Sequence, residues 1–295
     1  FHRIITDVQT DPRPYTSPES GRAQPRVHYV RDGSMQLMNK CLRFAVCRYS
    51  RFIVPWQPLS RYTNRNMATD GSDMFIWWGS GSCPCWRVLL TLQEKNLTKY
   101  GEKIVQFSKN EHKAPDVIAV NPRGQVPTFK HGNIAVNESL AVCIYLEETF
   151  KGQGVQLIPD NAVEKAMVLQ RFHESAINFQ SKMVDSLLYP NDELNEEELK
   201  KRQKALADEL KLWEGYLAEI GDGAYVAGKQ FSLADTTFFS FLAFAVRFGL
   251  QLDATVPNLK AYYEKVKQRP SVQNTWPPHW KESAGQDKLT NIFDL

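Results

Sequence analysis

A serine lies where the first recognisable strand of the chain meets a predicted helix. The apolar run at 74–78 predicts a strand, and residues 84–95 carry apolar side chains at helical spacing after a proline. Ser82 therefore lies in a strand-to-helix turn. Backbone N–H groups and the helix dipole favour a negative charge at such a turn, and ligands gather there in α/β sheets.

The chemistry that Ser82 could carry is the stabilisation of a bound thiolate by its hydroxyl. A free thiol has a pKa of ~8.5, so lowering it by about two units requires roughly 2.7 kcal/mol of preferential stabilisation of the anion. One hydroxyl donor beside a helix N-terminus can provide an effect of this size. The alternative is that Ser82 is only a turn or capping residue.

Two cysteines follow Ser82 in the sequence Cys83-Pro84-Cys85. Redox pairs are usually spaced C-x-x-C, and the single residue between these two disfavours a strain-free disulfide. Cys83 alone, at a helix N-terminus, is an alternative nucleophile with a lowered pKa. Cys85 is expected to be a small buried residue.

Two later turns carry groups that suit a peptide-like ligand. In Gln125-Val126-Pro127, a cis bond before the proline would turn the Val126 backbone toward a ligand strand, although an ordinary edge-strand proline is the alternative. Ser139 is expected to cap a helix over 139–150 whose N–H groups could hold a carboxylate, while Glu138 pairs with an ammonium. The pair would match an amino-acid zwitterion, or would be a plain cap beside a solvated acid.

The composition is that of a globular protein, with 42% hydrophobic and 23% charged residues. No apolar run of roughly eighteen residues predicts a membrane span. The five cysteines show neither a disulfide framework nor zinc-ligand spacing, so we expect no metal and a reducing compartment. The net charge of +3 divides into +7 for residues 1–66 and 3 − 7 = −4 for the remainder. The excess of basic residues is confined to a segment that does not look folded. We therefore expect neither nucleic acid nor membrane as a partner.

The segment 1–66 lacks sustained alternation or helical periodicity. We expect it to be disordered or to be a translated upstream extension, with natural initiation at Met67. The alternative is a mitochondrial presequence over 35–66, because that stretch has six Lys/Arg and no acidic residue. Pro55 and Pro58 would break a long amphipathic helix there.

The remaining chain divides into a part with strands and a part without. Beyond the first strand and helix, we expect a strand at 103–107, an irregular segment, a hairpin of 127–130 with 134–137, and the helix at 139–150. These elements form an α/β layer on a small mixed sheet.

After a linker at 151–160 only helical patterns occur. The expected elements are long amphipathic helices at 162–187 and 206–220, a buried helix at 232–248, a short helix at 258–268, and a tail at 276–295 that wraps the surface. Ser232-x-x-Asp235 is a capping box that opens the buried helix, with Phe231 as a staple residue.

These motifs together resemble those of a cytosolic glutathione transferase from Met74 to about Trp280. The likeness rests on the serine turn, the Gln-Val-Pro turn, Asn137-Glu138-Ser139 and the Ser-x-x-Asp box, in this order and at this spacing. It is greatest to the rho class, with theta and zeta classes similar at the serine turn. The rho marks are Trp78-Gly79-Ser80-Gly81-Ser82 and Trp276-Pro277-Pro278-x-Trp280.

The resemblance implies a thioredoxin-like α/β N-terminal domain over 72–152 that binds glutathione, and an all-α C-terminal helical domain over 160–295 that binds the electrophile. It implies transfer of the glutathione thiolate to small hydrophobic electrophiles in detoxification, or reduction of organic peroxides. It also implies a cytoplasmic homodimer; a presequence would instead direct the protein to mitochondria.

The family's site residues carry over onto matching positions of this sequence. Ser82 matches the catalytic serine. Val126, before a cis Pro127, would pair with the cysteinyl backbone of glutathione, and Glu138 and Ser139 would hold its γ-glutamyl end.

Two further positions match residues that contact the glycyl carboxylate of glutathione, namely His112 and Gln125. The electrophile pocket is expected between the domains. Its candidates, which fall on helices expected to face it, are Phe179, Met183 and Arg247.

Three other functions remain open from the sequence. Cys83 could serve a glutathione-dependent thiol-disulfide reductase, the serine turn could serve a zeta-like isomerase, and the fold could persist in a non-catalytic glutathione-binding relative. The sequence Ser82-Cys83-Pro84-Cys85 differs from the Ser-Ser-Cys-Ser of the isomerases, and this chain retains both the serine and the Glu-Ser pair.

Overall fold

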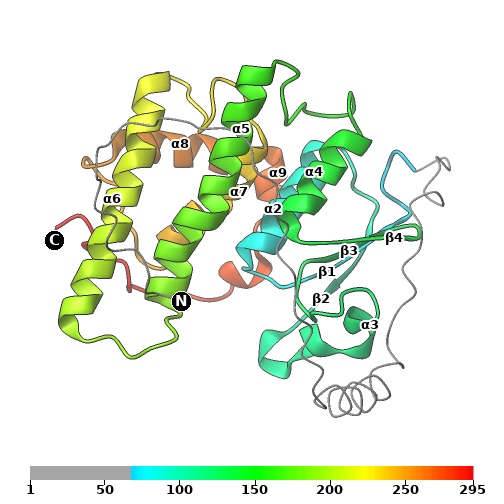
Figure 1. Ribbon diagram of the computed structural model, residues 1–295, viewed down its shortest axis with the longest axis horizontal. Helices are drawn as coiled ribbons and strands as arrows, with labels where there is room; N and C mark the ends of the chain where they lie inside the picture. Colours follow the sequence, from blue (N-terminus) through cyan, green and yellow to red (C-terminus); the bar gives the residue numbers. More distant parts are fainter. Residues whose placement is uncertain (1–67, 295) are drawn as a thin grey trace, which may run out of the picture. The chain divides into compact units, whose positions relative to one another are not determined.

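The computed structural model describes residues 68–294. The predictions for residues 1–66, including the presequence alternative over 35–66, lie outside the described residues. The first described unit is a sheet with the strand order β2-β1-β3-β4 (Figure 1), in which β1 pairs parallel with β2 and antiparallel with β3. The strands are β1 (Met74–Trp78), β2 (Gly101–Ile104), β3 (Thr128–His131) and β4 (Ile134–Asn137).

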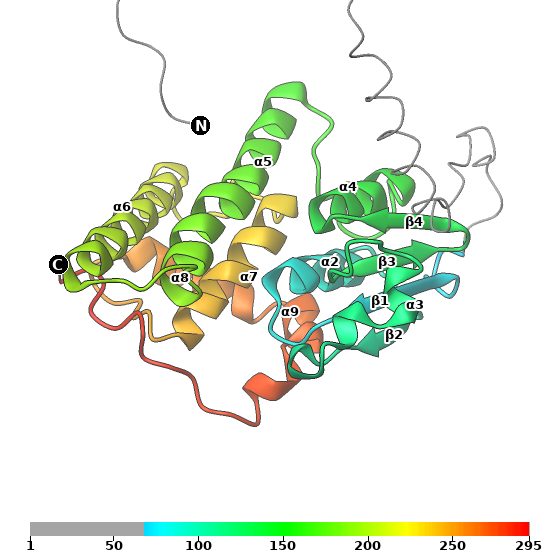
Figure 2. The same ribbon diagram turned by 60° about the horizontal axis from the view of Figure 1, so that its bottom comes forward.

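Alternation along β1 sends its side chains to two differently covered faces of the sheet. Ile76 and Trp78 belong to the main core, whereas Trp77 packs in a smaller cluster with Val105 and Val117 on the other face. Figure 2 shows the helices that cover the sheet. They are α2 (Cys83–Glu94), α3 (Pro115–Ile118) and α4 (Ser139–Thr149).

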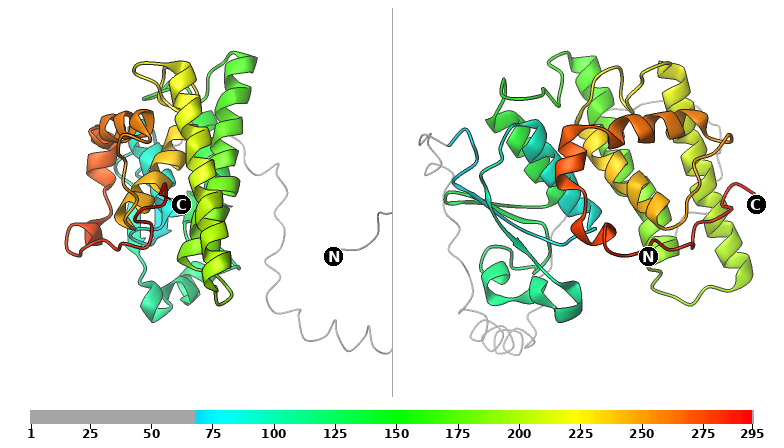
Figure 3. Two further views of the ribbon diagram at one scale, coloured as in Figure 1. Left: turned by 90° about the vertical axis from the view of Figure 1, so that its left-hand side faces the viewer. Right: turned by 180° about the vertical axis from the view of Figure 1, so that it is seen from behind.

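The second part of the chain is helical. Figure 3 shows the long helices α5 and α6 side by side, and the chain beyond α9 returning past the end of the bundle. Helix α7 is buried along most of its length because nearly all of its side chains are apolar or small. The helices are α5 (Ala162–Glu174), α6 (Glu196–Ile220), α7 (Leu233–Arg247), α8 (Pro257–Lys267) and α9 (Pro270–Thr275).

This architecture confirms the predicted fold class, an α/β thioredoxin-like part followed by an all-α part. Several expectations were wrong in detail, and the second long helix begins at Glu196 instead of at residue 206. The second strand covers 101–104 instead of 103–107, a short helix α3 lies in the segment expected to be irregular, and α9 was not predicted. The tail does not merely wrap the surface, because Trp280, Leu289 and Ile292 are buried in the core.

The helix expected over 162–187 is α-helical only to Glu174 and continues as the π-helical segments η4 (Ser175–Phe179) and η5 (Ser181–Leu188). The Ser175 hydroxyl donates to the carbonyl oxygen of Arg171, four residues earlier, and so competes with the backbone at the transition. A wider helix shifts which side chains face the neighbouring helices. Phe179 and Met183 of the apolar stripe are nevertheless fully buried.

Among residues 68–294, no helix combines the length and the apolar character that crossing a bilayer requires.

The capping box at the start of α7 is present as predicted, and it supports one test of the fold. The buried Asp235 carboxylate accepts from the N–H groups of Val226 at 3.0 Å and Ser232 at 2.8 Å. Asp235→Ala leaves these donors unpaired, so the free energy of unfolding in urea should fall by roughly 2–4 kcal/mol.

The matched control is Asp253→Ala, which removes an exposed carboxylate that accepts from Thr255 N–H. This variant should change stability little. Equal losses in both variants would contradict the role of the box.

Candidate active site

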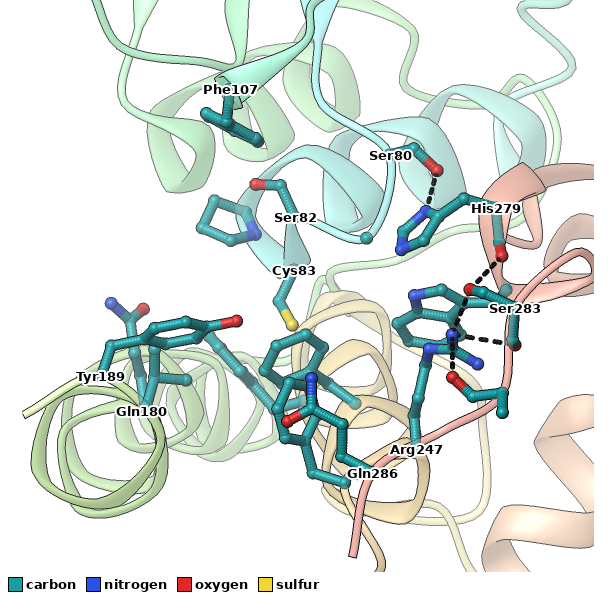
Figure 4. A pocket seen from close by; sticks show the side chains of 18 residues that line it. Ser80, Ser82, Cys83, Phe107, Gln180, Tyr189, Arg247, His279, Ser283 and Gln286 are labelled. Carbon is teal, nitrogen blue, oxygen red and sulfur yellow. Dashed lines mark hydrogen bonds between the residues drawn. The ribbon is translucent and has the colours of Figure 1, made fainter. Parts of the chain in front are cut away.

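Two adjoining cavities lie beside the N-terminus of α2. The smaller has a volume of 590 Å³ and the larger, shown in Figure 4, of 750 Å³. They share four lining residues: Ser82, Pro84, Phe107 and Gln180. The smaller cavity brings together all the residues predicted for catalysis and glutathione binding, which are Ser82, His112, Gln125, Val126, Pro127, Glu138 and Ser139.

Ser82 is held by a tight turn between β1 and α2. Its N–H donates to the Gly79 carbonyl at 3.1 Å, and Gly81 has φ +81°, a left-handed conformation that suits glycine. Ser82 is the N-cap residue of α2, but its hydroxyl makes no capping hydrogen bond. In Figure 4 this hydroxyl and the Cys83 thiol point to different sides of the turn. The Ser82 hydroxyl is therefore not used in the helix cap, and the neighbouring Cys85 sulfur is the acceptor with which a ligand would compete for it.

The Gln125-Val126-Pro127 turn presents its main chain to the smaller cavity. The Val126–Pro127 bond is cis, and the carbonyl of Gln125 accepts from Asn121 Nδ2 and Thr128 Oγ1 at 2.9 and 2.7 Å. Within residues 68–294 the Val126 N–H and carbonyl pair with no other backbone group. Buried backbone groups rarely stay unpaired, so this half-buried segment suits strand-like pairing with a ligand.

Glu138, and not Ser139, is the N-cap residue of α4. Ser139 is the first helical residue, and Glu138 has φ +76°, a conformation that is uncommon for a residue with a side chain. The expected Ser139 cap is therefore wrong, because the chain reverses direction one residue earlier. The N–H groups of the first turn of α4 still open onto the smaller cavity, where they favour an anion.

His112 adds a nitrogen that no group among residues 68–294 satisfies. Its Nδ1 atom is buried without a hydrogen-bond partner, and its ring lies 5.4 Å from that of Phe107. Both residues line the smaller cavity. A buried ring nitrogen without a partner in the protein is suited to bind a polar group of a ligand.

Sequence reasoning missed Arg87 as a site residue. Its side chain is 2% exposed, its Nε and Nη2 atoms have no hydrogen-bond partner in the described part of the chain, and it lines the smaller cavity. The guanidinium carbon lies 5.1 Å from the Phe241 ring centroid, and burial lowers the pKa of Arg87. A cation buried without an anion is costly. The signal in the sequence was a charged residue directly before the apolar run at 88–90.

The geometry opposes Cys83 as a nucleophile. Its thiol is buried and donates to the Ser240 carbonyl at 3.4 Å, and burial raises the pKa of Cys83 far above its usual range. The helix N-terminus was expected to lower the pKa of the Cys83 thiol, but this effect is smaller than the opposing effect of desolvation. Burial likewise raises the pKa of Cys85 and of Cys143 to about 11. Cys85 is a small buried residue, as predicted.

Two of the three residues proposed for the electrophile pocket do not reach it. Phe179 and Met183 are fully buried, and Phe179 packs against the ring of Phe238 at 5.4 Å. Other side chains of this stretch, Gln180 and Val184, line the larger cavity in their place. Arg247 does line that cavity. Sequence reasoning missed its other walls, which include Tyr189, Phe241, Phe244, Phe248, His279 and Trp280.

Within the described part of the chain, no cluster of three or more His, Cys, Asp and Glu side chains is placed to hold a metal ion.

Comparison with known proteins identifies relatives over nearly all of the described chain. A family model for the N-terminal domain of glutathione S-transferases matches residues 82–149, and a model for their C-terminal domain matches residues 177–274. Glutathione S-transferase A from Pleuronectes platessa is 48% identical over 225 residues, which are 75% of this chain and 99% of that protein.

A solved structure shows the same similarity in three dimensions. A glutathione S-transferase from the Antarctic clam Laternula elliptica superposes with a TM-score of 0.69 at 41% identity, covering 75% of this chain and 99% of the clam protein. A probable glutathione S-transferase from Oryza sativa subsp. japonica is 30% identical and aligns with 65% of this chain and 92% of its own length.

The raised thiol pKa values predict slow alkylation. Because the thiolate is the reactive form, iodoacetamide should label Cys83, Cys85 and Cys143 slowly at about pH 7, and faster as the pH rises toward the pKa of each thiol. Labelling in denaturant, followed by peptide mass spectrometry, provides the reference rate. Fast labelling of native Cys83 at neutral pH would show that it is a reactive nucleophile after all.

Proposed function

The chain belongs to the glutathione S-transferase family, and from that premise we propose that the Ser82 hydroxyl stabilises the glutathione thiolate for attack on an electrophile in the larger cavity. The chain is thus an enzyme that catalyses glutathione conjugation, and the proposal concerns how it does so. One observation supports it above the others: Ser82 lines both cavities. A thiolate beside Ser82 can therefore be bound from one cavity and react into the other.

The reaction requires only that the thiolate forms and is held. The thiol proton leaves to solvent, and the hydroxyl of Ser82 donates to the sulfur. A sulfur–carbon bond then forms as the leaving group departs with its electron pair, or as the π bond of an activated alkene breaks and its electron pair takes up a proton from solvent. No protein group changes its covalent state. The catalytic contribution is therefore the free energy by which the site favours thiolate over thiol.

Three features supply a positive potential at the sulfur. The N-terminus of α2 contributes its dipole, worth roughly 0.3–1 kcal/mol, and the Ser82 hydroxyl donates a charge-assisted hydrogen bond worth roughly 1.5–3 kcal/mol. Pro84 acts in the opposite direction, because a proline has no N–H and this helix end therefore has one donor fewer. The third contribution is the unpaired charge of Arg87, which is buried and lines the smaller cavity. A low-dielectric site screens this charge only weakly.

The smaller cavity fits the rest of glutathione. We assign the unpaired Val126 backbone to the cysteinyl peptide, and Glu138 with the first turn of α4 to the γ-glutamyl end. Gln125 and the unpartnered Nδ1 atom of His112 are assigned to the glycyl end. These assignments are supported by open hydrogen-bonding groups that line the cavity.

We place the enzyme in the rho class because its distinguishing tail motif packs on the serine helix. The rings of Trp276 and Trp280 meet the Trp86 ring edge-on at 5.3 and 5.4 Å, and Trp86 Nε1 donates to Thr275 Oγ1 at 2.9 Å. Edge-to-face aromatic packing fixes ring orientation. The tail therefore holds the N-terminal end of α2 in place.

We propose that the enzyme forms homodimers through the outer face of α5 and η4. Val163, Met167 and Ile177 expose 73%, 38% and 60% of their surfaces on this face. Apolar side chains gathered on one face of a helical segment are typical of a protein–protein interface.

Ser82→Ala should reduce kcat/KM with glutathione and a general aromatic halide by a factor of roughly 10 to 1000, the range for loss of one anion donor. Ser108→Ala is the control, because Ser108 is exposed and lines neither cavity, and it should keep the parent kcat/KM. Unchanged activity in Ser82→Ala would contradict the serine mechanism. Cys83→Ser should retain conjugation, and loss of conjugation there would revive the reductase alternative.

Arg87→Met should separate stability from activity. Removing an unpaired buried charge while keeping its volume should raise the free energy of unfolding by roughly 1–3 kcal/mol, whereas kcat/KM should fall because the bound thiol ionises less. The control is Arg171→Met, which loses a cation paired with Glu174 at 2.6 Å and should only lose stability. A variant at 87 that is both less stable and fully active would show that Arg87 serves the fold alone.

A further inference from the structure

The larger cavity is apolar on most sides but positively charged on one. Aromatic rings form much of its wall, and the only fully charged side chain among its described lining residues is Arg247, with His279 as a second nitrogen-bearing group. Within residues 68–294, no Asp or Glu lines it. A cavity with this lining favours a ligand that combines an apolar body with a negative charge.

Arg247 is held in place by neutral oxygens of the tail. Its Nη2 atom donates to the Ser283 carbonyl at 3.0 Å, the Ser283 hydroxyl at 2.7 Å and the Ala284 carbonyl at 2.8 Å (Figure 4). Its guanidinium carbon lies 5.4 Å from the Trp280 ring centroid. These contacts orient the side chain without neutralising its charge.

The guanidinium keeps donors for a ligand. The Nε and Nη1 atoms of Arg247 form no hydrogen bond with the described residues, and no carboxylate among residues 68–294 forms an ion pair with it. A planar guanidinium binds a carboxylate through two parallel N–H donors. An oriented and unpaired Arg at the wall of a substrate cavity is therefore equipped to bind an anion.

The positive character extends along this side of the cavity. Burial and the charge of Arg247 both lower the pKa of His279, against an opposing effect of Glu282, so the positive potential here comes from Arg247 and not from the ring. The Lys288 ammonium lies 5.9 Å from the ring centroids of Tyr189 and Phe248, two further lining residues. An incoming anion thus meets a favourable potential before it reaches Arg247.

We propose that the larger cavity selects electrophiles that carry an ionised carboxylate on an aromatic or long apolar body, and that Arg247 binds the carboxylate. This inference rests on the proposed function, since the electrophile must react beside Ser82. The 750 Å³ volume accommodates a drug-sized acid next to glutathione. The aromatic walls bind the body, while Arg247 orients the molecule from the end opposite to its reacting carbon.

The test compares para-(chloromethyl)phenylacetate with its methyl ester in the full chain. In both, the thiolate forms a bond to the benzylic carbon as the carbon–chlorine bond breaks and chloride leaves with its electron pair. Each kcat/KM is divided by the uncatalysed rate with glutathione. The parent should prefer the acid over the ester by roughly 10- to 100-fold, the factor expected for one charge-assisted interaction.

Arg247→Gln should bring this acid-to-ester ratio close to one, and Arg247→Lys should keep most of it. The acid-to-ester ratio distinguishes carboxylate binding from a structural effect, because a loosened tail would lower kcat/KM for both compounds by the same factor. Lys281→Gln, a neighbouring tail cation that does not line the cavity, is the matched control and should keep the parent ratio. A parent without acid preference, or an unchanged ratio in Arg247→Gln, would overturn the proposal.

Two further measurements separate this inference from the proposed function. Isothermal titration calorimetry with the acid and with the ester, in the absence of glutathione, reports binding without catalysis, and Arg247→Gln should weaken only the acid. If Ser82→Ala reacts as fast as the parent while the ratio still depends on Arg247, the serine mechanism fails and the carboxylate site stands. If Arg247→Gln instead raises the KM for glutathione with the ratio unchanged, the residue binds glutathione and the proposal is wrong.

Discussion

The burial of helix α2 between the sheet and the helical bundle is the constraint on which the rest of the site depends. Ten of its twelve residues are buried, and it packs against α4, α7 and α9. A helix covered on all sides can place its N-terminus in only one way, since any rotation would expose apolar surface at about 25 cal/mol per Å². That N-terminus carries Ser82, so the packing of both parts of the chain determines where the hydroxyl points. The two cavities meet at Ser82 because the two parts meet at α2.

Electrostatics at this junction favours an anion at the expense of stability. Arg87 lies inside the core with two nitrogen atoms unpaired, and Glu138 adopts a left-handed backbone conformation at the mouth of the smaller cavity. Each feature costs free energy in the isolated protein. Both are understandable if glutathione provides the missing partners, because strained and unsatisfied groups in native proteins concentrate where a ligand binds.

The fold class and the turns that carry Ser82, Val126 and Glu138 could be predicted because each follows from a local pattern, whereas His112 and Gln125 were indicated only by the family resemblance. The serine turn, the Gln-Val-Pro turn and the Asn-Glu-Ser segment are each shorter than ten residues. The larger cavity depends instead on how distant segments pack. Phe179 and Met183 belong to the apolar stripe and pack in the core, so that Gln180 and Val184 line the cavity, and the tail brings His279 and Trp280 to the site. Neither the choice of wall residues nor the position of the tail leaves a periodic signal. Arg87 was missed because helical spacing reveals a buried face but not that a buried charge lacks a partner.

The most direct test of the central claim is a titration of the glutathione thiol bound to the parent enzyme and to Ser82→Ala, followed by thiolate absorbance in the ultraviolet. The account predicts that the bound thiol titrates about two units below the free value of ~8.5 in the parent, and that the variant binds glutathione but loses a large part of this shift. A bound thiol with the same lowered pKa in both proteins would contradict it, and the source of the thiolate's stability would then have to be sought in Arg87 and the dipole of α2 alone.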